Sequence, residues 1–391
     1  MCVEPGGAGP INRAAMIASM AGASVFAFGK VALGSPHATH VPSDLRAVPQ
    51  AANSSPGALP AERIAQSSAR VRAAYSELLA MAAALESPTL RDATIALLKN
   101  PVPQYAVRLR TAAARAALRA QLLQAGFIDA MDALDASLPT ATHDFGAASQ
   151  RFMAAAGSGQ NSHHAYPGGL VLHELFNARS ASDLAHNYDR EYFGGRRTIN
   201  RDVVVAAALY HDVMKTVVFQ WDTRGGLSVE PNVAGTGAHH ILSAAEAIVR
   251  GHDARFVTVV LCAHAAPSLG EEVKVVAWAR AAAMVAGIDP VDFGLLKRTF
   301  DGFALATAPP IEAFISNLSD HDYVLSVHAM HEVHPRVDAA IAAGKVTGTK
   351  RLWYRNALLA RTSAIGLYGL LVRDEAAFRE RIERELSTLS A

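Results

Sequence analysis

The stretch AAALYHDVMK, residues 206–215, decides the fold of this chain. A mostly apolar run leads directly into His211 and Asp212, and Lys215 follows one helical turn later. Burying such a pair is costly unless a partner compensates it, and a divalent metal ion would do so. Asn200 offers an N-cap for this helix. We therefore expect a helix that delivers His211 and Asp212 to a metal, with Lys215 able to reach an anionic ligand held there.

Three other stretches place histidines among apolar neighbours: HHAYPGGLVLH at 163–173, AHHILS at 238–243 and LCAHAAP at 261–267. The Pro-Gly-Gly turn in the first of them predicts a helix start that positions a ligand. Imidazole and carboxylate ligands suit Mn, Fe, Zn, Co, Ni or Mg, so the ligand set names neither the metal nor whether one or two ions bind. The metal-ligand candidates are His173, His211, Asp212, His239, His240 and His264.

His239 and His240 are adjacent, and neighbouring positions of a helix differ in direction by about 100°. We therefore expect one of them to bind the metal and the other to pack beside it. The spacing to Leu242 and Ser243 favours His239 as the ligand.

Two further residues are candidates for binding a substrate. His164, which with His163 precedes the expected helix, is predicted to line the pocket. Arg197 follows a Gly-Gly turn and could bind phosphate through its guanidinium group. For Arg197 the alternative is a solvated turn.

The chain contains other histidines that serve as controls. The dipeptides His252-Asp253 and His321-Asp322 do not combine a long apolar run before them with a lysine one turn later. We interpret both as surface charge at a helix start or in a loop. No carboxylate partner is obvious for three histidines of a later helix, which we expect to be exposed: His328, His331 and His334.

The order His173, His211-Asp212 and Lys215 resembles the start of the HD superfamily of metal-dependent phosphohydrolases. The YPGGL opening at 166–170, followed by His173, is similar to a frequent form of the first helix in those proteins. The resemblance covers about residues 145–292. It implies an all-α domain that holds one or two divalent ions among its helices. It also implies that His239 or His240, with His264, are the additional ligands of a two-metal site.

The family pattern ends with an aspartate on a late helix, and the chain departs from the pattern at this position. Ala283 stands at that place within residues 277–290. Asp289 or Asp292 could replace the missing ligand with a shifted geometry. Otherwise one metal position would have fewer protein ligands than the other.

Composition supports an all-α protein, because 51% of the 391 residues are hydrophobic and good helix formers such as Ala, Leu, Arg and Glu are abundant. An apolar stretch at 14–29 after Arg13 resembles a secretory signal, which favours export to the periplasm over a cytoplasmic location. We expect an HD-type helical bundle with helical N- and C-terminal extensions. Its predicted parts are a signal segment at 1–34, a Pro/Ser-rich linker at 35–60, a helical extension at 61–144, the HD-type domain at 145–292 and a helical extension at 293–391.

Charge and cysteine content exclude several classes of function. Lys+Arg number 36 and Asp+Glu 35, so electrostatics gives no reason to expect a nucleic-acid partner. Cys2 and Cys262 cannot build a disulfide framework or a cysteine metal cage. We expect no membrane anchor once the signal segment is removed, and the sequence leaves the oligomeric state open.

These residues lead to the hypothesis of a metal-dependent phosphohydrolase that acts on a nucleotide or another phosphate ester through metal-activated water. Asp212 would bridge two ions, and Lys215 would offset charge that develops on the phosphate. Two alternatives stay open. One is an HD-fold di-iron oxygenase, and the other is a catalytically weak metal-binding or regulatory module.

Overall fold

The computed structural model describes residues 60–129, 149–344, 346, 348 and 350–390. The expected signal segment and the linker up to residue 59 therefore lie outside the described residues. Pro60 was assigned to the linker but is the first residue of a helix. Proline is favoured at such a start, because its missing N–H would have no partner in the helix.

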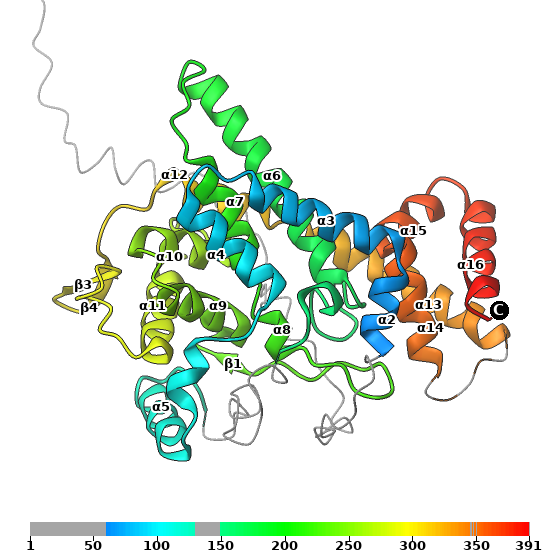
Figure 1. Ribbon diagram of the computed structural model, residues 1–391, viewed down its shortest axis with the longest axis horizontal. Helices are drawn as coiled ribbons and strands as arrows, with labels where there is room; N and C mark the ends of the chain where they lie inside the picture. Colours follow the sequence, from blue (N-terminus) through cyan, green and yellow to red (C-terminus); the bar gives the residue numbers. More distant parts are fainter. Residues whose placement is uncertain (1–59, 130–148, 345, 347, 349, 391) are drawn as a thin grey trace, which may run out of the picture. The chain divides into compact units, whose positions relative to one another are not determined.

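The described part of the chain is predominantly α-helical, which confirms the predicted fold class (Figure 1). Its α-helices are α2 (Pro60–Ser67), α3 (Ala69–Ala83), α4 (Pro88–Lys99), α5 (Ala112–Gln124), α6 (Gly169–Tyr192), α7 (Arg201–Tyr210), α8 (Lys215–Val218), α9 (Ala238–Val249), α10 (Ala254–Leu261), α11 (Glu272–Ala286), α12 (Ile311–Ser319), α13 (Tyr323–Ala343), α14 (Lys350–Thr362), α15 (Ala364–Leu371) and α16 (Glu375–Ser390). Short 3-10 helices are η2 (Tyr105–Leu109), η4 (Phe152–Ala154) and η5 (Cys262–His264).

Two β-hairpins interrupt the helices and were not predicted. Strand β1 (Asn232–Val233) pairs antiparallel with β2 (Thr236–Gly237), and β3 (Leu296–Thr299) pairs antiparallel with β4 (Gly302–Leu305). Strands this short carry no periodic signal in the sequence. The first hairpin matters for the site, because β2 runs directly into the first residue of α9.

Helix α6 is the element around which the site is built. It packs against α3, α7 and α12, and Figure 1 shows it in green among these helices. The side chain of Asn200 accepts a hydrogen bond from the backbone N–H of Val203, so the predicted N-cap of α7 is confirmed. Capping of this kind fixes where α7 begins, and with it where its far end places His211.

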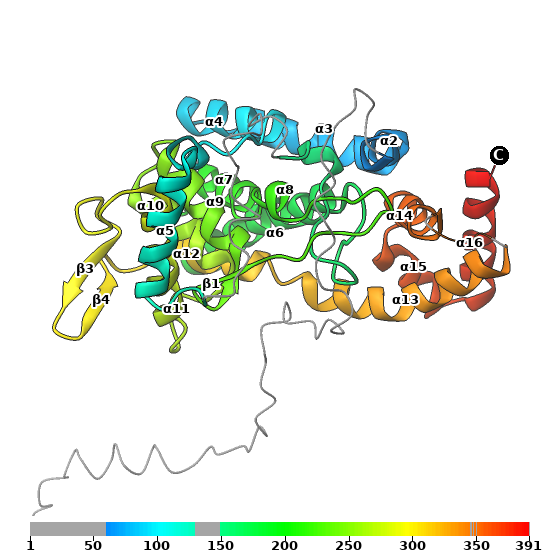
Figure 2. The same cartoon turned by 90° about the horizontal axis from the view of Figure 1, so that it is seen from below.

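Buried side chains form two large clusters. The larger contains residues from the elements between α3 and α12, and the second contains residues of α2 and of α13–α16. Figure 2 shows where these helices lie. Leu172 of α6 packs against both clusters. His173, the next residue of α6, is buried. Among the described residues, no helix is both long enough and apolar enough to cross a membrane.

The predicted helix start at Pro167-Gly168-Gly169 is confirmed and depends on both glycines. Gly168 has a φ of +85° and is the N-cap of α6. A Cβ atom on Gly169 would lie 1.9 Å from the carbonyl oxygen of His164. Because backbone atoms cannot give way as a side-chain end can, only glycine fits at this second position.

We expect Gly169→Ala to destabilise the fold by about 2–4 kcal/mol, because the clash must be relieved by moving the loop before α6. Urea unfolding followed by circular dichroism measures this. Gly195→Ala is the control for a glycine that has no neighbour within 4 Å of an added Cβ. It carries only the cost of a φ of +77°. A Gly169 variant as stable as the Gly195 variant would contradict the close approach.

Candidate metal centre

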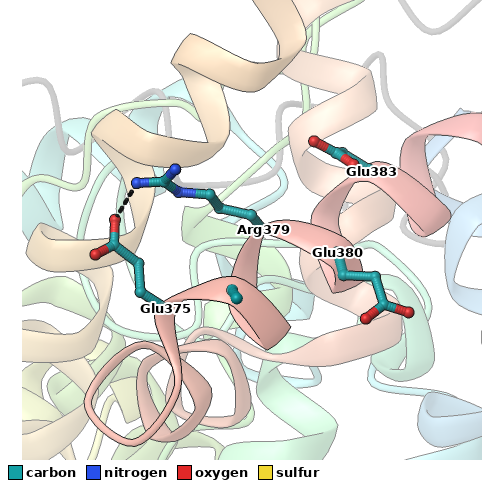
Figure 3. A pocket seen from close by; sticks show the side chains of 5 residues that line it. Glu375, Arg379, Glu380 and Glu383 are labelled. Carbon is teal, nitrogen blue, oxygen red and sulfur yellow. Dashed lines mark hydrogen bonds and ion pairs between the residues drawn. The ribbon is translucent and has the colours of Figure 1, made fainter.

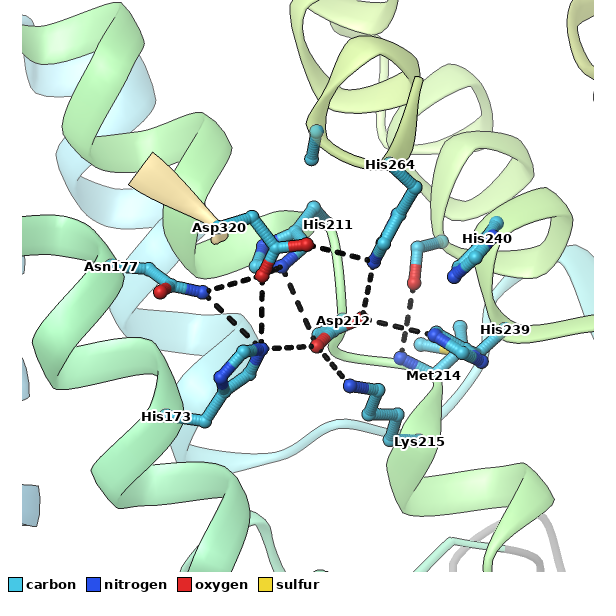
Figure 4. A network of polar contacts seen from close by, with 12 residues as sticks. His173, Asn177, His211, Asp212, Met214, Lys215, His239, His240, His264 and Asp320 are labelled. Atoms are coloured by element: carbon cyan, nitrogen blue, oxygen red, sulfur yellow. Dashed lines mark hydrogen bonds and ion pairs between the residues drawn. The ribbon is translucent and has the colours of Figure 1, made fainter. Parts of the chain in front are cut away.

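The structure brings the ligand candidates together from segments that are far apart in the sequence (Figure 4). His173 lies near the start of α6, and the turn between α7 and α8 carries His211 and Asp212. The remaining members come from the first turn of α9, from η5 and from the end of α12: His239, His240, His264 and Asp320. Every predicted ligand is in the cluster, and Asp320 is the one member that we did not predict.

The first group consists of His173, His211, Asp212 and Asp320, whose ligand atoms lie within 4.8 Å of one another. His173 Nε2 lies 3.0 Å from Asp212 Oδ2 and 3.1 Å from Asp320 Oδ1. His211 Nε2 lies 3.4 and 3.3 Å from the same two oxygens. All four residues are buried. Two imidazoles and two carboxylates thus converge on one point.

The second group consists of Asp212, His239, His240 and His264, again with ligand atoms within 4.8 Å of one another. Asp212 Oδ1 lies 3.1 Å from His239 Nε2 and 3.3 Å from His264 Nε2. The two oxygens of Asp212 therefore face different groups, Oδ2 the first and Oδ1 the second. Asp320 also spans both, since its Oδ2 lies 3.5 Å from His264 Nε2.

Several of the histidines are held through the ring nitrogen that points away from Asp212. His173 Nδ1 donates to Asp322 Oδ1 at 3.0 Å, and His211 Nδ1 donates to the carbonyl oxygen of Ala208 at 2.7 Å. His239 Nδ1 donates to Glu230 Oε1. Histidines that bind metals are held in this way, with one nitrogen donating and the other free to ligate. The donor set and its orientation therefore fit a metal ion.

The charges of the cluster depend on one another. Burial disfavours the imidazolium form of His211, but nearby carboxylates, first of all Asp212, outweigh it and raise its pKa to about 9. Burial alone would raise the pKa of Asp212, yet His211 and Lys215 hold it well below its usual range. Burial dominates at His264 and lowers its pKa to about 4. The carboxylates are thus ionised and call for positive charge, which protons or a metal can supply.

Lys215 lies inside the cluster. Its side chain is buried, forms an ion pair with Asp212 Oδ2 and donates a hydrogen bond of 2.6 Å to the carbonyl oxygen of Gly157. The prediction placed Lys215 close enough to reach a ligand on the metal. In the structure its ammonium group forms an ion pair with Asp212, the carboxylate that the two groups share.

The structure brings neither Asp289 nor Asp292, the two possible replacements for the late aspartate, to the cluster. Ala283 is buried within α11, and Asp289 and Asp292 are exposed in the turn that follows it. Asp289 accepts hydrogen bonds from the backbone of Val291 and Asp292 and has no contact with the cluster. Asp320, at the end of α12, brings a carboxylate into the cluster instead, so the cluster contains a residue that could take the place of the late aspartate.

The interpretation of His321-Asp322 as surface charge is also wrong for the aspartate. His321 is exposed, but the side chain of Asp322 is only 5% exposed and binds His173. The signal that could have found Asp320 was present in the sequence. Asp320 follows the apolar helix α12 just as His211 and Asp212 follow α7, although no lysine stands one turn later.

Two other residues beside the cluster, Glu174 and Asn177, were not predicted. Glu174 is fully buried, lies 3.6 Å from His211 Nδ1, and has a pKa that burial raises to about 8. Asn177 donates to Asp320 Oδ1 at 2.9 Å. Glu174 follows His173 directly on α6, and Asn177 lies one turn beyond it. Their positions relative to His173 were therefore the available signal.

Both His239 and His240 are members of the second group, so the structure brings both candidates to the same place. The expectation that only one of them binds the metal stays a prediction. The two rings are 4.0 Å apart and nearly perpendicular, and His240 stacks on His264 at 3.5 Å. Their positions in the first turn of α9, next to the β1–β2 hairpin, leave both sides of the helix covered by protein. The structure thus offers both imidazoles to a metal.

The two substrate-binding candidates have different outcomes. His164 is buried beside the first group, with its ring 5.6 Å from that of His173, and its pKa is lowered by burial to about 4. His163, also buried, lies 5.0 Å from His173. Arg197 is exposed and pairs with Glu86 at 2.7 Å. It follows α6, whose 24 residues span about 36 Å, so Arg197 is far from His173 and the solvated turn is correct.

The remaining histidines follow the prediction only in part. His328 and His331 are exposed, as expected, but His334 is buried beside Arg355, and burial lowers its pKa to about 3. His252 is also buried and contacts the Tyr210 hydroxyl at 2.8 Å. Asp253, in contrast, is the N-cap of α10 and fits the predicted helix start.

A shallow hollow on α16 is lined by exposed charged side chains and is remote in sequence from the cluster (Figure 3). Arg379 pairs there with Glu375 one turn away. Charges spaced in this way are typical of a solvated helix face, so we assign no site to it.

Comparison of the chain with protein-family models, curated proteins and solved structures finds no match. The resemblance to the HD superfamily therefore rests on the residues named above.

Proposed function

We propose that this protein is a metal-dependent phosphohydrolase that uses two divalent ions to hydrolyse a phosphate ester. The observation that carries the proposal is Asp212, a buried carboxylate whose two oxygens face two different groups of histidines. A carboxylate shared in this way suits a pair of closely spaced ions, as found in many enzymes of phosphate chemistry. The substrate class would be nucleotides or other phosphate monoesters or diesters.

The first group would hold one ion and the second group the other. Mixed imidazole and carboxylate ligands favour Mn, Fe, Co, Ni or Zn, whereas Mg prefers oxygen ligands alone. Bound ions would polarise a phosphoryl oxygen and lower the pKa of a coordinated water. His264, at 11% exposure the most accessible histidine of either group, marks the side from which a phosphoryl group would approach.

Lys215 would contribute charge rather than ligation. An ammonium group cannot bind a metal, but in a buried site it stabilises negative charge that develops on a phosphoryl group. Its bonds to Asp212 and Gly157 fix its position before the substrate arrives. His163 and His164 would line the neighbouring wall and orient the ester.

Metal analysis of the purified protein, followed by assays on p-nitrophenyl phosphate and bis-p-nitrophenyl phosphate, tests the proposal. We expect about two metal equivalents and hydrolysis of at least one of these esters. His211→Ala should lose the ion of the first group and hydrolysis, and Asp292→Asn should keep both ions and hydrolysis. Bound iron without hydrolysis would favour oxygenation of a small molecule. A protein that binds no metal would favour the regulatory module.

Lys215→Met is expected to retain both ions and to slow hydrolysis by about 10²–10³-fold, as for the loss of one preorganised charged donor. The methionine side chain keeps most of the buried volume of the lysine side chain. Asp212 Oδ2 no longer pairs with an ammonium group, so it can bind the metal without that competition. Metal content and kcat are measured together, with Lys274→Met as the control because Lys274 is an exposed lysine at the start of α11. Unchanged kcat in Lys215→Met would remove this residue from the mechanism.

A further inference from the structure

Two carboxylates belong to neither group, yet each forms a hydrogen bond with a histidine of one group. Asp322 binds His173 of the first group, and Glu230 binds His239 of the second. The two come from different segments, the start of α13 and the loop before β1. Neither was recognised in the sequence: Asp322 was interpreted as surface charge, and Glu230 lies in a loop before α9.

Asp322 meets His173 on the side that faces away from Asp212. Its Oδ1 accepts a hydrogen bond from His173 Nδ1 at 3.0 Å, and its Oδ2 lies 3.9 Å from His164 Nε2. Although Asp322 occupies the N-cap of α13, its side chain makes no capping hydrogen bond. The carboxylate is therefore committed to the histidines, and His173 Nε2 is left to face Asp212 and Asp320.

Glu230 holds His239 at two points. Its Oε1 accepts from His239 Nδ1 and, at 2.8 Å, from the backbone N–H of the same residue. Gly237 makes room for this carboxylate, since a Cβ at that position would lie 2.5 Å from Glu230 Oε2. His239 Nε2 is thereby directed at Asp212 Oδ1, 3.1 Å away.

We propose that Asp322 and Glu230 are positioning residues that act separately, Asp322 for the ion of the first group and Glu230 for the ion of the second. A carboxylate that accepts from one imidazole nitrogen fixes the ring and makes the other nitrogen a stronger ligand. The two carboxylates contact different histidines in the structure, so either metal position can be weakened alone. The inference rests on the proposed two-metal site but assigns these residues independently of the reaction.

Zn²⁺ affinity, measured by competition with a chromophoric chelator, tests the inference without any assay of activity. Asp322→Ser keeps a residue suited to an N-cap but withdraws the carboxylate from His173. Glu230→Ala does the same for His239. Each variant is expected to bind one Zn²⁺ roughly 10–100-fold more weakly and the other as the wild type does. Asp292→Ser, an exposed carboxylate in a turn, is the matched control.

Three further comparisons assign each carboxylate to its ion. In a His173→Ala background, where the first position is already lost, Asp322→Ser should change nothing more, whereas Glu230→Ala should still weaken the second position. Gly237→Ala should reproduce the effect of Glu230→Ala, because the added methyl group displaces the Glu230 carboxylate. Asp322→Asn and Glu230→Gln should retain most of the affinity, since an amide oxygen still accepts from Nδ1. Circular dichroism establishes that each variant is folded, and Gly237→Ala takes the place of Glu230→Ala if Glu230→Ala is not folded.

The inference is overturned if Asp322→Ser and Glu230→Ala both bind two Zn²⁺ as tightly as the wild type. It is overturned in its claim of separate action if each variant weakens both ions equally. A wild-type protein that binds no Zn²⁺, Mn²⁺ or Fe²⁺ overturns the proposed function itself, and this inference with it. Loss of one ion in each variant, without phosphatase activity in the wild type, supports the positioning role and contradicts only the hydrolase.

Discussion

Asp212→Ala is expected to remove both metal ions and to reduce hydrolysis by at least about 10³-fold. The reason is that Asp212 is the one residue present in both groups, with Oδ2 facing His173 and Oδ1 facing His239. Any other single ligand belongs mainly to one group. Loss of His240, for example, should weaken only the second position.

The same variant should also be less stable, by about 3–5 kcal/mol, because it leaves the buried ammonium of Lys215 without its carboxylate. The double variant Asp212→Ala/Lys215→Met should recover most of that stability, since no buried charge is then unpaired. It should not recover the metal. This separates the structural role of the ion pair from the role of Asp212 as a ligand.

Metal content after dialysis, urea unfolding and ester hydrolysis measure the three effects. Asp338→Ala/Arg355→Met provides a comparison, because Arg355 and Asp338 form an ion pair of 3.0 Å that is not part of the cluster. Retention of a full complement of metal in Asp212→Ala would show that the two groups do not share this carboxylate. The proposed dinuclear site would then be wrong.

Asp320→Ala is expected to empty the first metal position and to weaken the second. Its Oδ1 lies 3.1 and 3.3 Å from the two histidines of the first group, and its Oδ2 lies 3.5 Å from His264 of the second. A position that keeps only two imidazoles and the shared Asp212 should bind its ion at least about 10²-fold more weakly.

Asp289→Asn and Asp292→Asn are the matched controls and should bind metal as the wild type does. Both side chains are exposed in the turn after α11 and contact no histidine of the cluster. Titration with Zn²⁺ or Mn²⁺ compares the three variants. A large loss of affinity in either control, with none in Asp320→Ala, would return the late ligand to the place that the sequence pattern first indicated.

Local sequence determined the fold class and most residues of the candidate metal centre. The apolar run before His211 and Asp212 predicted a helix that ends in a metal site, and the Pro-Gly-Gly turn predicted the start of α6. Helix starts and apolar periodicity depend on neighbours within a few residues, so one sequence suffices to find them.

Other members of the site depended on long-range packing. Asp320 is more than 100 residues from Asp212, and it reaches the cluster only because α12 packs against α6 and α7. The apolar run before Asp320 marks it as a candidate, but the local sequence does not show that it meets Asp212 and the histidines of the cluster. The family pattern indicates an aspartate on the helix that is α11 here, whereas the carboxylate in the cluster comes from the end of α12.

The sequence by itself determined that this protein is built from helices and carries a histidine- and aspartate-rich centre near residues 173–264. Only the tertiary structure decided that Asp320 completes that centre, that His239 and His240 both face it, and that Asp322 and Glu230 hold its histidines. The physical reason is that helix formation is governed by local hydrogen bonds and side-chain spacing. The direction of a buried carboxylate is set instead by which helices pack together, and that depends on the whole chain at once.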